Sequence, residues 1–460
     1  MYKLTPLIKQ YYNIKKKYPN TILLFQVGEF YEIFGYDAII CSRILDITLT
    51  KRNKKKNNNI YLVGFPCKSL NIYLKKLIKY KYKIAICNQE NNKINDKKNL
   101  INRKITEIIT PTLSLHDSIN KKKINKKYIS SIYFKLNKIG ISLIDFSNGD
   151  FLTSEGNLQY IKHIINCFKP KEFLIQKSKK TIFNNLFNKN NNFFFTLIDD
   201  NIYNYNILYS ILLKHFNVLS LNCFGIDNMY LSIITSGLLI YYIKNYYNFK
   251  LNHINKIKII DINKYLWIDD STMKHLEIIK SINKNGKSLL SILDYTYTSM
   301  GYRLLNNWLL FPLREKKKIY NRQQIIKYFY KFNDNLLLNL TLNLKKIFDL
   351  DKIISKISNN KINPNQYYKF ILSIKNIINI IKLLKIKDNN KIFNIKKKII
   401  NKFNKLFFKI KFLVKKNTIN NFNKKFFICY NIYNFLDLLK YKYKKIKDKI
   451  INHYKKKKNN

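Results

Sequence analysis

The segment from Leu24 to Phe34 holds the densest group of chemically useful side chains in the sequence. It reads Leu-Phe-Gln-Val-Gly-Glu-Phe-Tyr-Glu-Ile-Phe, so aromatic and carboxylate residues crowd around Gly28. Glycine tolerates backbone angles that other residues avoid, and Gly28 therefore allows a sharp turn before Phe30 and Glu32. Composition alone favours a structural interpretation, in which Phe30 is buried and the carboxylates are solvated.

The sequence contains one candidate for a nucleotide-binding loop, and this candidate matches the P-loop motif poorly. A P-loop needs G-x-x-x-x-G-K-[ST], because its glycines let backbone N–H groups cradle phosphate. Of the ten glycines only Gly286 precedes a lysine, in Gly286-Lys287-Ser288, and Ser281 stands where the motif requires its first glycine. No strand-like run comes before it, so we expect no nucleotide site here.

Metal and disulfide chemistry lack a motif altogether. The six cysteines form no C-x-x-C pair and the six histidines are scattered, which argues against a zinc site or a disulfide framework. We expect reduced cysteines, no metal ligands, no catalytic residues and a cytoplasmic location. We also expect no leader and no membrane association, since no uncharged apolar run approaches the ~18–20 residues that span a bilayer.

The charge of the chain favours polyanionic partners. Lys and Arg total 86 against 27 Asp and Glu, a formal charge of +59, and only six of the basic residues are arginines. Such an excess attracts DNA, RNA or an acidic membrane surface. The alternative is that AT-rich codons, which encode Lys, Asn, Ile and Tyr, supply the lysines without selection for binding. In either case, any contact with DNA would weaken steeply with salt.

The elements that must position Phe30 and Glu32 form a mixed α/β domain. The sequence predicts a helix over 5–18, since Thr5 caps it and a proline suits its first turn. A buried strand over 21–27 follows, and after the glycine turn we expect a helix that carries Tyr31, Ile33 and Phe34. The remaining predictions are strands at 47–50, 60–65, 83–87 and 103–110, an amphipathic helix at 69–79 and a basic loop at 51–59.

The rest of the chain shows two further patterns of secondary structure. A hairpin pattern over 128–146 and a turn at 147–150 begin an alternation of strands and helices, which predicts a second α/β domain. From about residue 257 the apolar residues recur with a period of 3.6 and glycine is nearly absent, which predicts an all-α third domain.

The segment around Gly28 resembles the G-D-F-Y-E-x-F signature of the MutS family, the bacterial mismatch-recognition proteins. Further motifs resemble the family in order and spacing across almost the whole chain. They are Leu45–Arg52, Gly64-Phe65-Pro66, Ala85–Gln89, Ile109-Thr110-Pro111, Phe146–Phe151, His215-Phe216 through Gly225, Leu276-Glu277-Ile278, Ser288–Asp294, Met300–Leu305, Trp308, Pro312-Leu313, Arg322-Gln323, Tyr430-Asn431 and Leu436-Asp437.

The resemblance implies an architecture and a function in DNA mismatch repair. It implies an α/β mismatch-recognition domain over 1–112, a linker over 113–127, an α/β (RNase H-like) connector domain over 128–250, an all-α core or lever domain over 251–430 and the truncated start of a DNA clamp over 431–460. The implied partner is duplex DNA that contains a mismatch, together with a MutL-type protein and a second copy of the chain.

Four residues receive roles from the same resemblance. Phe30 would stack on a mispaired base from the minor groove and kink the duplex there. Glu32 would hydrogen-bond the displaced base, and Val27 would lie near the lesion. Arg52 would contact the DNA backbone, which positions the protein without reading sequence.

The sequence departs from the family pattern at three positions and in its extent. Glu29 stands where Asp is usual, Lys68 where His is common, and Thr112 where Gly usually follows Pro111. We expect these changes to alter backbone contacts or a turn and to leave Phe30 and Glu32 unaffected. The family also has an ATPase domain that binds ATP and Mg and dimerises; the glycine pattern predicts that this chain lacks it and holds no cofactor.

Three functions therefore stay open. The chain is a mismatch-binding module, the recognition subunit of a split ATPase that works with a separate C-terminal chain, or a basic nucleic-acid-binding remnant without discrimination. The sequence also leaves open whether the chain is a working fragment or the product of a decaying gene.

The first testable prediction concerns nucleotide chemistry. We expect no ATP hydrolysis by this chain alone, because its glycine pattern provides no phosphate-binding loop. The measurement is phosphate release from the purified protein. Release above background that is abolished by Lys287→Ala would contradict the prediction.

Overall fold

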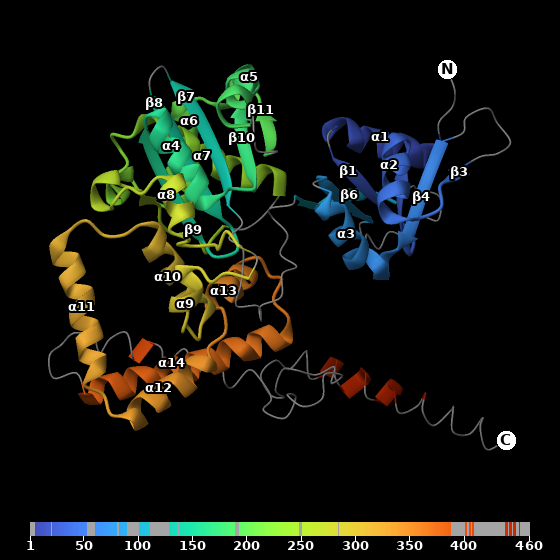
Figure 1. Ribbon diagram of the computed structural model, residues 1–460. Helices are drawn as coiled ribbons and strands as arrows, with labels where there is room; N and C mark the ends of the chain where they lie inside the picture. Colours follow the sequence, from blue (N-terminus) through green and yellow to red (C-terminus); the bar gives the residue numbers. More distant parts are fainter. Residues whose placement is uncertain are drawn as a thin grey trace. The chain divides into compact units, whose positions relative to one another are not determined.

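The computed structural model (Figure 1) describes most of the first 387 residues. The chain divides into two compact units. Unit 1 comprises Met1–Ser118, Asn125–Asn263 and Trp267–His275, and unit 2 comprises Ile119–Ile124, Lys264–Leu266 and Leu276–Asn460. The described residues are 5–19, 21–52, 60–80, 82–89, 101–110, 128–135, 138–188, 193–247, 251–283, 285–387 and isolated helical positions between 401 and 450. The predicted linker, the loop at 53–59 and nearly all of the predicted clamp segment lie outside them.

The first sheet of unit 1 has the strand order β3-β4-β2-β1-β5-β6, with β1 parallel to β5 and the other neighbours antiparallel. Three helices accompany it. The elements are α1 (Pro6–Lys17), β1 (Ile22–Val27), β2 (Phe30–Phe34), α2 (Tyr36–Leu45), β3 (Thr50–Arg52), β4 (Ile60–Pro66), α3 (Leu70–Lys79), β5 (Ile84–Gln89) and β6 (Arg103–Ile109).

Both faces of this sheet are covered, which explains why its central strand is a continuous apolar run. Leu23 and Phe25 of β1 join one buried cluster with Tyr11 of α1. Ile22 and Leu24 belong to the opposite cluster, which buries residues of α2 and α3. The two clusters fix the register of β1, because a shift by one residue would exchange its two faces.

The predicted helix is wrong for Tyr31, Ile33 and Phe34, because these residues belong to strand β2. Tyr31 and Ile33 are buried in the cluster beneath α2 and α3, while Phe30 is exposed and Glu32 is partly exposed. This alternation has the period of a strand. The hairpin partner β1 recruits the segment, and a stretch this short is helical or extended according to its neighbours.

The other predictions for this sheet vary in accuracy. The helix at 5–18 and the helix at 69–79 are confirmed by α1 and α3, and the strands at 21–27, 60–65, 83–87 and 103–110 by β1, β4, β5 and β6. The strand at 47–50 is wrong for all but its last residue, because Asp46 takes a left-handed conformation that ends α2 and the chain enters β3 only at Thr50. Pairing with β4 extends β3 through Lys51 and Arg52, which the sequence assigned to a loop.

The second sheet of unit 1 has the order β11-β10-β7-β8-β9-β12 and confirms the second predicted α/β region. Its elements are β7 (Ile129–Lys135), β8 (Lys138–Asp145), β9 (Asp150–Gly156), α4 (Leu158–Phe168), β10 (Glu172–Gln176), α5 (Lys180–Phe183), β11 (Phe194–Ile198), α6 (Tyr205–Phe216), α7 (Tyr230–Tyr247), β12 (Lys258–Ile259) and α8 (Asp270–His275). Strand β12 pairs with β9, so the helical region begins later than residue 257.

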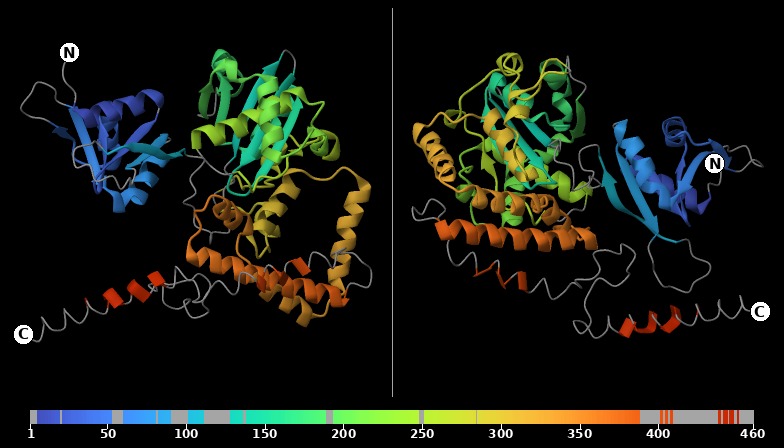
Figure 2. Two further views of the ribbon diagram at one scale, coloured as in Figure 1. Left: turned by 180° about the vertical axis from the view of Figure 1, so that it is seen from behind. Right: turned by 60° about the horizontal axis from the view of Figure 1, so that its bottom comes forward.

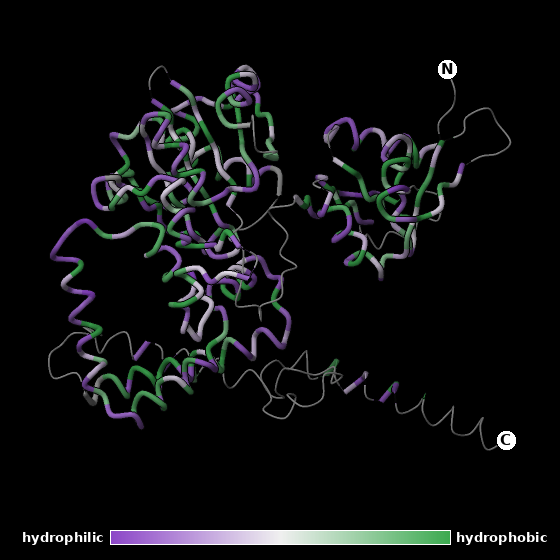
Figure 3. Tube along the Cα trace, in the orientation of Figure 1, coloured by the Kyte–Doolittle hydropathy of each residue, from purple (hydrophilic) through white to green (hydrophobic). Residues whose placement is uncertain are grey.

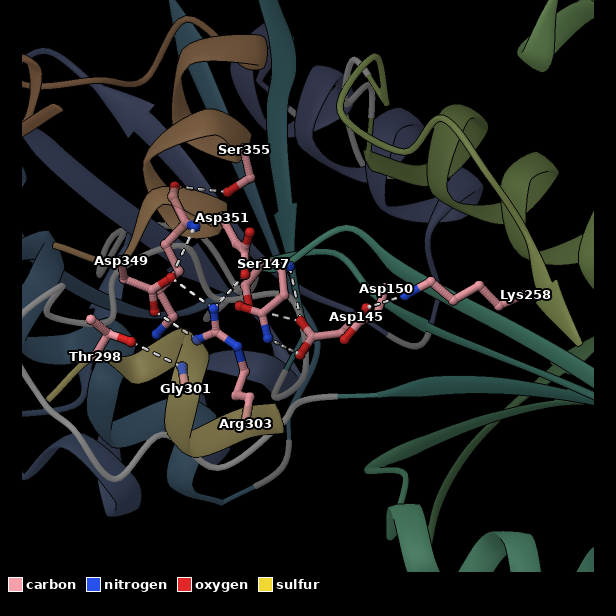
Figure 4. A network of polar contacts seen from close by, with 12 residues as sticks. Asp145, Ser147, Asp150, Lys258, Thr298, Gly301, Arg303, Asp349, Asp351 and Ser355 are labelled. Carbon is pink, nitrogen blue, oxygen red and sulfur yellow. Dashed lines mark hydrogen bonds and ion pairs between the residues drawn. The ribbon is translucent and has the colours of Figure 1, made fainter. Parts of the chain in front are cut away.

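Helix α7 lies along β7 and β8 (Figure 2) and is joined to β8 by buried hydroxyl groups. Ser142 Oγ is 2.7 Å from Thr235 Oγ1 and 2.9 Å from Ser236 Oγ. Gly237 lets α7 approach α6, because a Cβ there would lie 2.6 Å from Leu208 Cβ. The predicted turn between β8 and β9 is confirmed: the buried Asp145 carboxylate accepts hydrogen bonds from residues 147 and 148 (Figure 4).

A buried lysine joins the two sheets within unit 1. Lys83, next to β5, donates to Thr196 Oγ1 at 2.6 Å and to Tyr242 OH at 3.2 Å. Both hydroxyls donate in turn to Glu172 Oε1, which is fully buried and 3.9 Å from Lys83 Nζ. Burial lowers the pKa of Lys83, and the charge of Glu172 opposes that shift.

Unit 2 is helical over the described residues, as the sequence predicts. Its helices are α9 (Leu289–Leu293), α10 (Ser299–Leu310), α11 (Lys316–Tyr330), α12 (Asp334–Lys345), α13 (Leu350–Ser358) and α14 (Pro364–Lys387). Helices α12 and α13 pack against α14, which is largely hydrophobic, whereas α11 is mostly hydrophilic (Figure 3).

A buried ion pair fixes α10 against the start of α13. The Arg303 guanidinium donates to both oxygens of Asp349, at 2.8 and 2.9 Å, and to Asp351 Oδ2 (Figure 4). Burial lowers the pKa of Arg303, but the hydrogen bonds and charges of the two aspartates outweigh burial and leave it raised. Asp349 also caps α13 by accepting from the Lys352 backbone N–H.

The second prediction tests this pair. Arg303→Ala should lower the free energy of local unfolding in α10 and α13 by about 3–5 kcal/mol, because it leaves the Asp349 carboxylate buried and unpaired. Hydrogen exchange in these helices as a function of urea measures the change. Arg322→Ala is the matched control, because Arg322 stacks on Trp308 at 3.8 Å from the ring centroid. Its loss should have an effect of about 1 kcal/mol or less. Equal effects of the two variants would contradict the prediction.

Candidate nucleic-acid interface

The candidate interface is built on the tip of the β1–β2 hairpin. Val27 pairs with Phe30, so the loop between them consists of Gly28 and Glu29 alone. Gly28 has a positive φ of 62° and Glu29 does not, which is the pattern of a type II′ turn with glycine first. The amide of Cys67, next to β4, donates to Glu29 O at 2.8 Å and holds the loop from the other side.

Phe30 is the exposed aromatic side chain of this tip. Its side chain is 48% exposed, whereas the neighbouring Tyr31 is 5% exposed. The interpretation that composition alone favoured, a buried Phe30, is therefore wrong. Phe30 pairs across β2–β4 with Pro66, at the end of β4. The hairpin thus presents a ring that packs only partly against the protein.

Glu32 follows on the same face, because side chains two apart on a strand point to the same side. It is partly exposed and pairs with Phe25 on β1 and with Gly64 on β4. A Cβ at Gly64 would lie 3.7 Å from Glu32 Cγ, so glycine leaves the side of the carboxylate stem uncovered. The structure brings Phe30 and Glu32 together as the sequence predicted, although on a strand.

The two other predicted site residues, Val27 and Arg52, lie on different strands of the same sheet. Val27, at the end of β1, pairs directly with Phe30, so the two side chains are neighbours on one face and Val27 is partly buried. Arg52 ends β3, where its backbone pairs with that of Ile60 on β4. The Arg52 side chain lies outside the described part of the chain, and its relation to Phe30 stays a prediction.

Sequence reasoning missed the polar groups that hold the tip. Arg103, the first residue of β6, donates through Nε to Gln26 O at 2.6 Å. The Gln89 backbone N–H donates to Gln26 Oε1 at 3.1 Å, and Gln26 Nε2 donates to Gly28 O at 3.2 Å. Asn88 accepts from the Tyr31 hydroxyl at 2.8 Å. In the sequence, the run Ala85–Gln89 appears only as one motif of the family resemblance. The convergence of Arg103, Gln26 and Gln89 on the turn has no signal in sequence spacing.

Burial keeps the titratable groups beneath the tip in their neutral forms. It raises the pKa of Tyr31 to about 12, with smaller contributions from Cys67 and Cys87. Burial also raises the pKa of the Cys87 thiol to about 12, against the charge of Arg103.

The other candidate chemistry of the sequence has plain structural roles. The Gly286 amide donates to Asn283 O at 3.1 Å, and Ser288 caps the five-residue helix α9 by accepting from the Ser291 amide. Over the described residues, no group of three or more His, Cys, Asp or Glu side chains is placed to hold a metal ion. None of the helices that the structure describes is long and apolar enough to cross a membrane.

Models of known protein domains match three consecutive parts of the chain. Residues 5–118 match the model of MutS domain I, residues 127–255 that of MutS domain II and residues 271–454 that of MutS domain III. The hairpin with Phe30 and Glu32 lies in the first match, strands β7 to β11 of the second sheet lie in the second, and helices α9 to α14 lie in the third.

Curated relatives agree with the family models. The DNA mismatch repair protein MutS of Flavobacterium johnsoniae is 40% identical over 365 residues, which are 79% of this chain and 41% of that protein. The proteins of the same name from Parabacteroides distasonis and Bacteroides fragilis are 39% and 37% identical over similar lengths. The aligned part of the chain spans 41% of the length of each of these relatives. With three successive domains matched in order, the chain belongs to the MutS family and corresponds to its N-terminal portion, domains I, II and III.

Proposed function

We propose that the chain binds duplex DNA at mispaired bases and that Phe30 is the wedge. The observation that carries the proposal is the 48% exposed ring of Phe30 at a two-residue hairpin turn, inside the match to MutS domain I. An apolar wedge unstacks a base step and kinks the duplex, at a cost of a few kcal/mol. A mispair is held less firmly, so the same deformation costs less there and the protein discriminates by deformability.

Glu32 supplies the second part of the proposed recognition. Its carboxylate accepts a hydrogen bond from the displaced base beside Phe30. Toward an intact duplex, whose bases stay stacked, the same charge faces phosphates and is repulsive, which penalises the wrong partner. Val27 flanks the wedge at the lesion, and Arg52 contacts the phosphate backbone without reading sequence.

The formal charge of +59 supports a general electrostatic contribution to the same binding. That contribution acts on matched and mismatched duplex alike. It also favours the second candidate function, a basic nucleic-acid binder that does not discriminate. The two candidates differ in one measurable quantity, the ratio of affinities for mismatched and matched duplex.

The third prediction tests the wedge. Phe30→Ala should lower affinity for a G·T or single-base-bulge duplex roughly tenfold to hundredfold, because base–aromatic stacking is worth about 1–3 kcal/mol. Affinity for matched duplex should change little. Titration of both duplexes at low salt measures the two affinities.

Tyr36→Ala is the matched control for that titration. Tyr36 is a 76% exposed aromatic residue of the same domain, and it lies away from the hairpin tip at the start of α2. Its loss should leave both affinities unchanged. Equal binding of both duplexes by the wild type, with Phe30→Ala weakening both equally or neither, would leave only the general binder.

The fourth prediction tests the carboxylate. Glu32→Gln should raise affinity for matched duplex and reduce discrimination by roughly threefold to tenfold, since the repulsion toward phosphates disappears while the size of the side chain stays the same. Glu29→Gln makes the same change of charge three residues before Glu32, on the exposed loop. It should strengthen binding of both duplexes equally. A similar loss of discrimination in the two variants would contradict a specific role for Glu32.

A further inference from the structure

Arg103 reaches from the outer strand of the first sheet to the hairpin tip. It is the first residue of β6, and β5 separates β6 from β1. Its guanidinium nevertheless donates to the Gln26 carbonyl of β1 at 2.6 Å. It also donates through Nη1 to Ile101 O at 2.9 Å. One side chain thus ties the backbone on both sides of β5.

The same guanidinium extends its contacts to the turn itself through Gln89. With the amide oriented so that its oxygen faces donors, Gln89 Oε1 accepts from Arg103 Nη2 at 3.0 Å and from the Gly28 amide at 3.2 Å. Gly28 is the loop residue with positive φ, two residues before Phe30. The loop amide therefore obtains a partner from β5, and Arg103 orients that partner.

Helix α1 holds Arg103 from the other side. Gln10 Oε1 accepts from Arg103 Nη1 at 3.1 Å, and the guanidinium carbon lies 4.9 Å from the centroid of the Phe25 ring. The Arg103 guanidinium stacks its flat face on Phe25 while its N–H groups donate hydrogen bonds. Only a planar group with several N–H donors can make both kinds of contact at once. A lysine at this position would keep the charge and lose the planar fork.

The charge of Arg103 also acts on the recognition face. Burial lowers the pKa of Arg103, while the nearby Cys87 and Glu32 oppose that shift. Glu32 and Phe25 are paired across β1 and β2, so the guanidinium that stacks on Phe25 is on the face that carries Glu32. The hairpin residues thus fix the position of the Arg103 side chain, and the Arg103 side chain in turn restrains the hairpin.

We propose that Arg103 is a positioning residue for the wedge: it fixes the tip of the β1–β2 hairpin, and so Phe30, before DNA binds. This inference rests on the proposed function of Phe30. A tip that is ordered in advance loses less freedom on binding than a mobile one, and this gain is realised only when the ring inserts. Arg103 itself does not touch DNA in this proposal.

The binding experiment is a double-mutant cycle in the full chain. Arg103→Lys should reduce affinity for mismatched duplex roughly threefold to tenfold in the wild-type background and leave matched duplex unchanged. In the Phe30→Ala background, it should have almost no effect on either duplex, since there is no wedge left to position. Arg43→Lys, an exposed arginine of α2, is the matched control and should change nothing.

A second measurement does not depend on DNA. Hydrogen-exchange mass spectrometry of the full chain should show at least a severalfold faster exchange in peptides that cover residues 26–31 of Arg103→Lys. Peptides from α2 and α3 should exchange as in the wild type, which shows that the domain stays folded. Unchanged exchange at the tip, or equally faster exchange throughout the domain, would overturn the proposal.

The two measurements separate the failure of this inference from the failure of the proposed function. If Phe30→Ala leaves discrimination intact, the wedge function is wrong, and exchange at the tip alone decides whether Arg103 holds the hairpin. If Phe30→Ala abolishes discrimination but Arg103→Lys weakens mismatched binding equally in both backgrounds, the wedge stands and the positioning role of Arg103 is overturned.

Discussion

The pairing of Val27 with Phe30 is the constraint on which the candidate interface depends. Side chains alternate along a strand, so this one register decides the face of every residue in β2. Tyr31 and Ile33 enter the core beneath α2 and α3, and Phe30 and Glu32 are left on the opposite face. A loop longer by one residue would reverse these assignments and bury the exposed ring.

The sheet around the hairpin makes this register costly to change. Both of its faces carry buried clusters, and β1 contributes to each. Around the tip, apolar packing gives way to hydrogen bonds among Gln26, Gln89 and Arg103. Hydrogen bonds are directional, whereas apolar contacts are not, so a polar ring suits a tip whose orientation matters.

Buried charged groups join distant elements in both units, in the same way. Lys83 connects the two sheets through Glu172, and Arg303 connects α10 to α13 through Asp349. Such pairs add little net stability compared with apolar contacts, but a single broken partner is strongly destabilising. They therefore favour one relative placement of the elements they join. The many exposed lysines contribute charge but do not fix the position of one element relative to another.

The sequence by itself determined the order of the domains and most of the strands and helices. It also identified Phe30 and Glu32 as the candidate recognition residues. These follow from apolar periodicity, from turn residues and from the resemblance of several motifs in one order. Only the tertiary structure decided that β2 is a strand and that Arg103 holds the tip. A five-residue segment has no periodicity long enough to distinguish helix from strand, so its hairpin partner settles the conformation. Arg103, Gln89 and Gln26 are far apart in the chain, and they meet only because β6, β5 and β1 are neighbours in one sheet.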